Sequence, residues 1–139
     1  MRPPETISKA KPISTDDRRR QLALAAARTA AENRGRDVTI MDMRELTSAF
    51  DYFVIATGTS RRHLHAMADE IDDALSKELG CQRLGVEGYE GSHWILLDYG
   101  EIVVHLFDEP TRDYYALERL WCDSKQVPFE PPATTANSF

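Results

Sequence analysis

The turn Gly58-Thr59-Ser60 has residue types and a spacing that could hold a phosphate group. It follows a nearly continuous apolar run, residues 51–57, and opens a segment with helical periodicity. A turn in this position offers backbone N–H groups and the positive end of a helix dipole to an anion. It is not a Walker loop, because Gly-Lys-Ser/Thr is missing. An ordinary turn, with Thr59 or Ser60 capping the helix, explains the same residues and is the favoured interpretation.

Nucleotidyltransferases open their catalytic helix with a similar glycine–serine turn. Those enzymes also hold two metal ions on paired carboxylates of the following strand. The acids that follow the turn here, Asp69, Asp72 and Asp73, fall on the predicted helix. The next predicted strand, near residues 83–86, supplies no acid pair. We therefore expect no enzyme activity, with an active nucleotidyltransferase that uses this turn as the alternative.

The four histidines do not have the spacing of a metal site. His63 and His65 are two residues apart on a predicted helix, so their side chains point about 200° apart. His93 and His105 fall on different predicted strands and could approach each other, but no cysteine or acid cluster completes a tetrahedral set with them. We expect neither a metal ion nor a cofactor.

Aromatic residues are densest between positions 94 and 121, which hold both tryptophans and three of the five tyrosines. In an extended strand Trp94, Leu96 and Asp98 share one face, and Tyr99 lies on the other. Large apolar groups on an uncovered sheet face indicate a protein interface, where Trp and Tyr are common anchors. Helices on both faces of the sheet would make the same aromatics core residues, and the pattern leaves both interpretations open.

Periodicity and turn residues predict the elements that position these side chains. Helices are expected from the Ser14–Asp17 start to Gly35, from Thr59 or Ser60 to Gly80, and from Asp108 or Thr111 through Trp121. Strands are expected over residues 38–43, 51–57, 82–86, 94–98 and 102–107, the last two joined as a hairpin by Tyr99-Gly100-Glu101. This order predicts an α/β fold: a single domain with a mixed sheet of about five strands and helices packed on it.

Composition sets the boundaries of the domain and the class of protein. The chain has 139 residues, 42% hydrophobic and 29% charged, which is typical of one globular domain and excludes a fibrous or wholly disordered protein. We expect a flexible segment over residues 1–13, the folded domain over 14–127 and a disordered tail over 128–139. The longest apolar run, residues 22–27, is too short to span a membrane, the first residues lead into no apolar run of the signal-peptide kind, and the two cysteines form no disulfide framework. A cytoplasmic location follows as an expectation.

Charge is divided unevenly along the chain. Residues 1–36 carry nine Lys/Arg and four Asp/Glu, a net of +5, while residues 37–139 carry eight and nineteen, a net of −11. A body of this charge is repelled by nucleic acid phosphates, so a basic protein is the more natural partner. The basic N-terminal segment could still touch RNA at an edge.

Six phrases, taken in order and spacing, resemble the ribosomal silencing factor family (RsfS, also called Iojap). They are D-Y-F-V-I-A-T-G-T-S-R-R-H from Asp51, A-D-E-I from Ala68, L-G-V-E-G from Leu84, W-I-L-L-D-Y-G from Trp94, V-V-H-L-F from Val103 and R-D-Y-Y-A-L-E-R-L-W from Arg112. The resemblance covers about residues 14–123, nearly all of the predicted domain. It implies a nucleotidyltransferase-like α/β fold without the catalytic acids.

The resemblance also implies a function without chemistry. Such a protein binds the large ribosomal subunit through its fourteenth protein, blocks joining with the small subunit and so represses translation under nutrient limitation. The family is further linked to large-subunit assembly, and homodimers occur in it. A homodimeric scaffold module that uses the aromatic hairpin is therefore a second alternative.

The same resemblance implies which residues meet the partner. It assigns partner binding to the W-x-x-x-D-x-G strand, which is represented here by Trp94, Asp98, Tyr99 and Gly100, with Tyr99 at a position where many relatives carry leucine. Peripheral contact with ribosomal RNA is expected from Arg18, Arg19 and Arg20.

Overall fold

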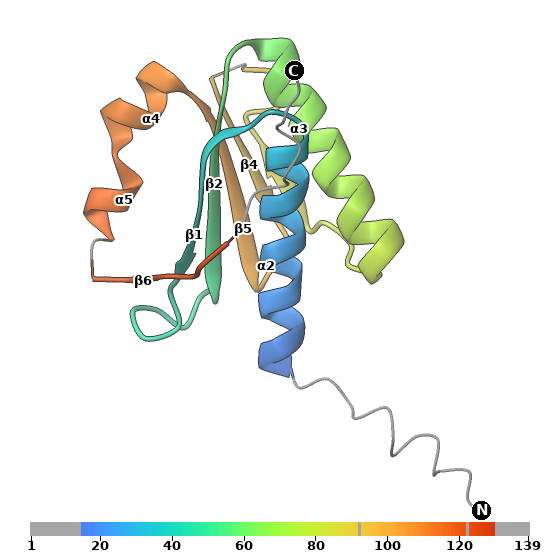
Figure 1. Cartoon of the computed structure of the whole chain (residues 1–139), viewed down its shortest axis with the longest axis vertical. Helices are drawn as coiled ribbons and strands as arrows, with labels where there is room; N and C mark the ends of the chain where they lie inside the picture. Colours follow the sequence, from blue (N-terminus) through green and yellow to red (C-terminus); the bar gives the residue numbers. More distant parts are fainter. Residues whose placement is uncertain (1–14, 92, 122, 130–139) are drawn as a thin grey trace, which may run out of the picture.

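The computed structural model describes residues 15–91, 93–121 and 123–129 of the chain. The elements in order are α2 (Thr15–Glu32), β1 (Arg36–Asp42), β2 (Tyr52–Gly58), α3 (Arg61–Asp73) with a π-helical turn (Ala74–Glu78), β3 (Gly85–Glu87), β4 (Trp94–Asp98), β5 (Ile102–Asp108), α4 (Glu109–Tyr115), α5 (Leu117–Leu120) and β6 (Lys125–Gln126). They form a single α/β domain around one open mixed sheet (Figure 1). No helix in these described ranges is long and apolar enough to cross a membrane.

The sheet has six strands in the order β3-β4-β5-β2-β1-β6 rather than the expected five. Its central pair, β2 and β5, is parallel, and the other pairs are antiparallel. The additional strand is β6, which pairs with β1 and is followed by Val127, whose N–H donates to the Ile40 carbonyl at 2.9 Å. Two polar residues, Lys125 and Gln126, have no apolar alternation, so the sequence contained no signal for this strand.

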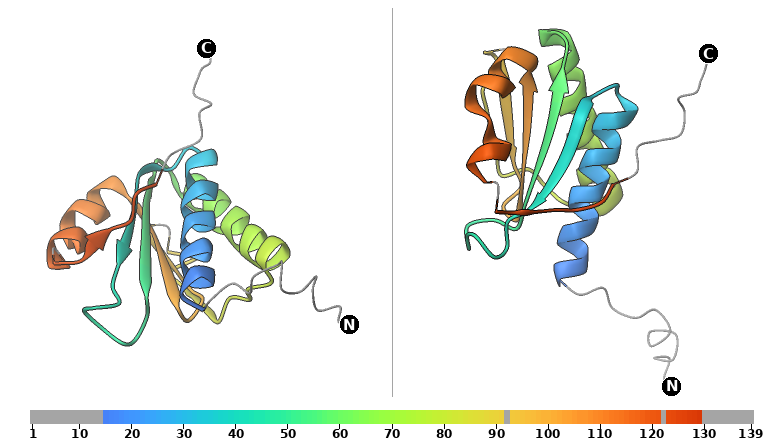
Figure 2. Two further views of the ribbon diagram at one scale, coloured as in Figure 1. Left: turned by 60° about the horizontal axis from the view of Figure 1, so that its bottom comes forward. Right: turned by 60° about the vertical axis from the view of Figure 1, so that its left-hand side comes forward.

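Helices α2 and α3 cover one face of the sheet, and α4 and α5 lie on the other (Figures 1 and 2). The predicted start of α2 is confirmed, and its buried stripe is mostly alanine, which lets the helix lie close to β1 and β2. Leu64, Met67 and Ile71 of α3 close the same core without measurable exposure. We call the sheet face that α2 and α3 cover the helix side.

Helix α2 ends at Glu32, three residues before the predicted end at Gly35. Arg34 takes the left-handed conformation (φ +67°), Gly35 N–H donates to the Ala30 carbonyl at 2.8 Å, and Arg34 N–H donates to Ala31 at 3.0 Å. This is a Schellman ending, with arginine where glycine is usual. Gly35 is required for a different reason, because a Cβ there would lie 2.9 Å from Met67 Sδ.

The predicted helix through Trp121 is not continuous. Asp108 caps α4, but Ala116 adopts a left-handed conformation (φ +45°) and separates α4 from the short α5. We call this break the elbow. The two short helices cover only part of their face, where a smaller core is formed by Met41, Met43, Phe53, Ile55, Val103 and Phe107. We call the sheet face that α4 and α5 partly cover the open face.

The two chain ends differ in how far they are described. Residues 1–13 and 130–139 lie outside the described residues. Phe129, which the sequence assigned to the tail, packs against the helix-side core, and Val127 beside it is buried. The folded part therefore extends to at least residue 129.

Candidate partner-binding face

The Gly58-Thr59-Ser60 turn is a helix cap. Ser60 Oγ accepts a hydrogen bond from His63 N–H at 3.0 Å, as expected of an N-cap residue. The Thr59 N–H donates to His63 Nδ1 at 2.9 Å, so this group is also occupied. Gly58 is needed for packing, since a Cβ there would lie 2.7 Å from Leu64 Cδ2. These contacts leave the turn poorly suited to a phosphate group.

Asp108 is the carboxylate nearest to that turn in the sheet, because it is paired with Gly58 across β5 and β2. It accepts hydrogen bonds from Thr111 N–H at 3.0 Å and contacts His93 Nδ1 at 2.6 Å. Burial acts to raise the pKa of Asp108, but the hydrogen bonds from Thr111 and His93 lower it overall. In the described parts of the chain, no group of three or more His, Cys, Asp or Glu side chains could hold a metal ion.

A polar hollow of about 600 Å³ lies between the start of β1 and the elbow. Its charged lining residues are Asp37, Glu109, Arg112, Asp113, Glu118 and Arg119. Acids outnumber bases there, and the Arg112 guanidinium already binds Glu118. An anionic ligand would gain little from this arrangement.

The open face contains a second, more apolar hollow of about 520 Å³. Its lining residues are Ala49, Phe50, Phe53, Leu84, Glu87, Leu96, Asp98, Gly100, Val103 and His105. The floor consists of β2, β4 and β5 side chains, and Phe50 comes from the loop between β1 and β2. A smaller hollow along β4, lined by Glu87, Gly88, Trp94 and Leu96, shares Glu87 and Leu96 with it. The two hollows adjoin at these shared residues, and we call them together the groove; Glu87 and Asp98 are its acidic lining residues.

Trp94 is half-buried and held in a fixed orientation on this face. Its Nε1–H donates to His105 Nδ1 at 3.1 Å. Its ring centroid lies 4.8 Å from that of Phe107 and 4.7 Å from that of Tyr115. Because the indole N–H is satisfied within the protein, Trp94 offers a partner an apolar ring surface.

His105 is a buried, neutral part of the same face. Burial lowers its pKa to about 4, so the ring carries no charge at neutral pH. Since Nδ1 accepts from Trp94, the proton is on Nε2, which has no hydrogen-bond partner among the described residues. The ring meets Phe53 edge-on at 4.6 Å between centroids.

The structure brings together three of the four residues assigned to partner binding. Asp98 and Gly100 line the larger hollow, and Asp98 Oδ1 accepts from Gly100 N–H at 2.8 Å to fix the turn. Trp94 lies farther along the same strand face. Tyr99 points to the helix side, is 3% exposed and donates its hydroxyl to Asp72 Oδ1 at 3.0 Å. Burial and the Asp72 carboxylate raise the pKa of Tyr99. Its side chain therefore does not form part of the open face.

The most exposed large apolar residues of this face are Tyr114 (80%), Leu84 (72%) and Tyr115 (48%). The aromatic density of residues 94–121 had already pointed to the two tyrosines, but sequence reasoning did not single out Phe53 or Leu84 as residues of a partner-binding surface. Phe53 was hidden in the apolar run of β2, although period-two alternation would have placed it on one face with Ile55 and Thr57. Leu84 fell within the strand predicted over residues 82–86, but the observed edge strand β3 is Gly85–Glu87, so Leu84 directly precedes it.

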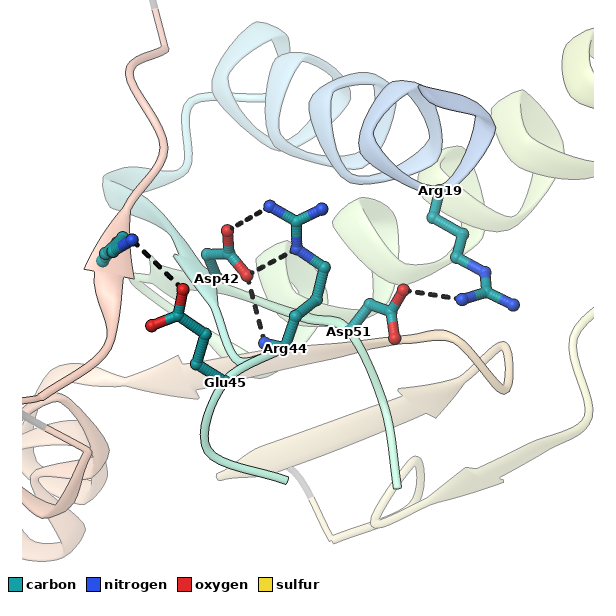
Figure 3. A network of polar contacts seen from close by, with 6 residues as sticks. Arg19, Asp42, Arg44, Glu45 and Asp51 are labelled. Atoms are coloured by element: carbon teal, nitrogen blue, oxygen red, sulfur yellow. Dashed lines mark hydrogen bonds and ion pairs between the residues drawn. The ribbon is translucent and has the colours of Figure 1, made fainter. Parts of the chain in front are cut away.

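Ion pairs hold the loop that carries Phe50 (Figure 3). The Arg44 guanidinium donates to both carboxylate oxygens of Asp42, at 2.9 and 2.7 Å, and thereby lowers the pKa of Asp42. At the two ends of the loop, Lys125 contacts Glu45 at 3.3 Å and Arg19 contacts Asp51 at 2.8 Å. The loop is thus tied to both α2 and β6.

Two of the three arginines expected to meet RNA bind within the protein. Arg19 pairs with Asp51, and the Arg18 guanidinium donates to the Leu79 carbonyl at 2.6 Å, at the end of the π-helical turn. Through these contacts, Arg18 and Arg19 join α2 to the rest of the domain.

A family model described as "Ribosomal silencing factor during starvation" matches residues 16–138. The ribosomal silencing factor RsfS of Bacillus subtilis is 39% identical over 103 residues, which is 74% of this chain and 86% of that protein. The mouse protein named mitochondrial assembly of ribosomal large subunit protein 1 is 37% identical over 93 residues, 65% of this chain and 40% of its own length.

A solved structure supports the same assignment. The crystal structure of a protein from Chromobacterium violaceum superimposes with a TM-score of 0.71 at 34% identity, covering 84% of this chain and 95% of that one. The family match spans nearly the whole described domain, and the fold agrees with it. The chain therefore belongs to the ribosomal silencing factor (RsfS) family.

Proposed function

We propose that this protein binds the large ribosomal subunit through its fourteenth protein and blocks joining with the small subunit. Translation would then fall when nutrients are limited. The observation that carries the proposal is the open face, where Trp94, Leu96 and Leu84 border an apolar groove that the described helices leave uncovered. The family match supports a ribosomal partner. Blocking subunit joining requires affinity and bulk at the right place, and no bond needs to be made or broken.

The charge of the groove favours a basic protein as the contact. Glu87 and Asp98 lie at its edge, and residues 37–139 carry a net charge of −11. An acidic rim around an apolar centre complements a partner that presents an apolar side chain flanked by lysine or arginine. Ribosomal RNA would contact the protein only peripherally, at the N-terminal end of α2, where Arg18 is exposed and Arg19 and Arg20 are partly exposed.

A non-enzymatic role fits the local geometry. The Gly58-Thr59-Ser60 turn uses its serine hydroxyl and the Thr59 N–H to begin α3. The neighbouring Asp108 caps α4 instead of pairing with a second carboxylate. The nucleotidyltransferase alternative would need metal-dependent nucleotide turnover, and its detection with purified protein would overturn this part of the proposal.

Cosedimentation with separated ribosomal subunits tests the proposal. We expect the wild type to pellet with the large subunit and not with the small one. Trp94→Ala should raise the Kd roughly 30-fold, which corresponds to about 2 kcal/mol for a desolvated aromatic anchor. Trp94→Phe is the matched control: it loses the hydrogen bond to His105 and part of the ring surface but keeps an aromatic ring against Phe107 and Tyr115, so it should weaken binding less than Trp94→Ala. Failure of the wild type to pellet with either subunit would contradict the proposal.

The homodimeric scaffold alternative uses the same apolar face. A dimer that buries the groove would hide Trp94 from any other partner. Light scattering decides whether such a dimer forms, and Trp94→Ala should dissociate it. A dimer that pellets with neither subunit would favour the scaffold over the ribosomal role.

A further inference from the structure

Arg112 is a buried cation whose side chain joins three elements to α4. It is 8% exposed, and its Nη1 donates to Thr57 Oγ1 of β2 at 2.8 Å. Nη2 lies 3.4 Å from Thr39 Oγ1 of β1. The Nε group donates to Glu118 Oε2 of α5 at 3.1 Å, and Nη2 contacts the same oxygen. A buried guanidinium with partners on all sides fixes the positions of the groups around it.

The ion pair between Arg112 and Glu118 depends on the elbow between α4 and α5. Residues six apart in a continuous α-helix are separated by about 240° around the axis and about 9 Å along it, so they cannot pair. The left-handed Ala116 turns the chain and brings Glu118 back to Arg112. Left-handed alanine is sterically disfavoured, so the elbow needs contacts of this kind to persist.

The elbow also sets the position of two exposed aromatic residues. Tyr115 directly precedes Ala116, and its ring centroid is 4.7 Å from that of Trp94. Tyr114 packs perpendicular to Tyr115 at 4.9 Å. Tyr114 is 80% exposed and Tyr115 is 48% exposed, so they continue the aromatic surface of the hairpin onto α4.

We propose that the Arg112–Glu118 pair is a positioning device that presents Tyr114 and Tyr115 beside Trp94, so that the partner-binding surface extends from β4 onto α4. This inference rests on the proposed function. Exposed tyrosine rings suit a lysine or arginine side chain of a basic protein, through cation–π contacts. Arg112 itself does not touch the partner; it acts through Tyr115.

A double-mutant cycle on large-subunit binding tests the positioning role. Tyr115→Ala should raise the Kd about fivefold or more, as for an interface residue that contributes to binding. Glu118→Gln should raise it about threefold, because the elbow loosens and Tyr115 leaves its position. In the Tyr115→Ala background, Glu118→Gln should add nothing. Additive effects would overturn the inference, since they would mean that Glu118 acts independently of Tyr115.

Glu109→Gln is the matched control on α4. Glu109 forms a surface pair with Arg36 at 3.4 Å and does not bridge the elbow, so its loss of charge should leave the Kd unchanged. An equal weakening by Glu109→Gln would show that net charge, and not the elbow, determines the effect of Glu118→Gln.

A second measurement on the free protein separates this inference from the proposed function. The NMR signal of the Trp94 indole N–H senses the Tyr115 ring next to it. Glu118→Gln should shift that signal in the same direction as Tyr115→Ala, and Glu109→Gln should not shift it. An unchanged signal in Glu118→Gln overturns the positioning role even if the wild type binds ribosomes. A shifted signal together with no ribosome binding would reject the proposed function but would still support the role of the Arg112–Glu118 pair in positioning Tyr115.

Discussion

The two faces of the sheet are closed in different ways, although the same strands form both. On β2, Val54 and Ala56 point to the helix side and are fully buried under α2 and α3. Phe53, one residue away, points to the open face and lines a hollow of about 520 Å³. The helix side is closed by aliphatic packing, whereas aromatic rings, an elbow and ion pairs hold the open face in shape. This difference agrees with the proposed function, in which the helix side provides stability and the open face is the surface for a partner.

The largest expected effect is on the free energy of unfolding, when a leucine is replaced by alanine on each of the two faces. Leu64 has no exposure under the helix side, and Leu84 is 72% exposed at the edge of the open face. Leu64→Ala should lower the free energy of unfolding by about 2–5 kcal/mol, because it leaves a cavity. Leu84→Ala should change it by less than about 0.5 kcal/mol. Urea unfolding of both variants measures this, and similar losses would show that the two faces contribute alike to stability.

The next largest expected effect is the loss of stability at acidic pH that His105 on the open face should cause. Burial lowers the pKa of His105 from 6.5 to about 4, so below pH 6.5 the unfolded chain binds a proton that the native protein does not. The free energy of unfolding should therefore fall by about 2 kcal/mol between about pH 7.5 and about pH 5.

His105→Gln should flatten that part of the pH profile, and urea titrations at a series of pH values measure it. The lowered pKa values of the Asp42 and Asp108 carboxyls place their own losses at more acidic pH, below their ordinary value of 3.8. A slope that is the same in wild type and His105→Gln would mean that His105 is accessible to protons in the native state.

The smallest expected effect on stability concerns Tyr99, which lies in the turn of the hairpin but whose side chain is buried on the helix side. Tyr99→Phe removes the hydrogen bond to Asp72 and should cost about 1 kcal/mol of stability. Binding to large subunits should stay at the wild-type level, because the ring does not reach the open face. Weaker binding with unchanged stability would place Tyr99 in the interface after all.

Local patterns in the sequence were sufficient for much of the fold. The Ser60 cap, the hairpin over Gly100 and the start of α2 follow from signals within a few residues, and the structure confirms them. Period-two alternation also placed Tyr99 opposite Trp94, although the family motif had grouped the two residues as partner-binding. Within a strand, the alternation was the better guide to which face a side chain occupies.

The features that the sequence did not predict depend on contacts between distant residues. The elbow at Ala116 is held by Arg112, whose partner Thr57 is 55 positions away. Strand β6 exists because it pairs with β1, far earlier in the chain. The hollow of the open face combines a loop, three strands and an edge segment, so it becomes visible only when all of them are placed.

Site-specific photo-crosslinking to large ribosomal subunits tests the central claim most directly. A photoactivatable amino acid would replace Leu84 on the open face in one protein and Ala66, exposed on α3, in another. We predict a crosslink from position 84 to the fourteenth protein of the subunit, identified by mass spectrometry, and none from position 66. A crosslink from position 66 alone would contradict the assignment of the open face as the ribosome-binding surface.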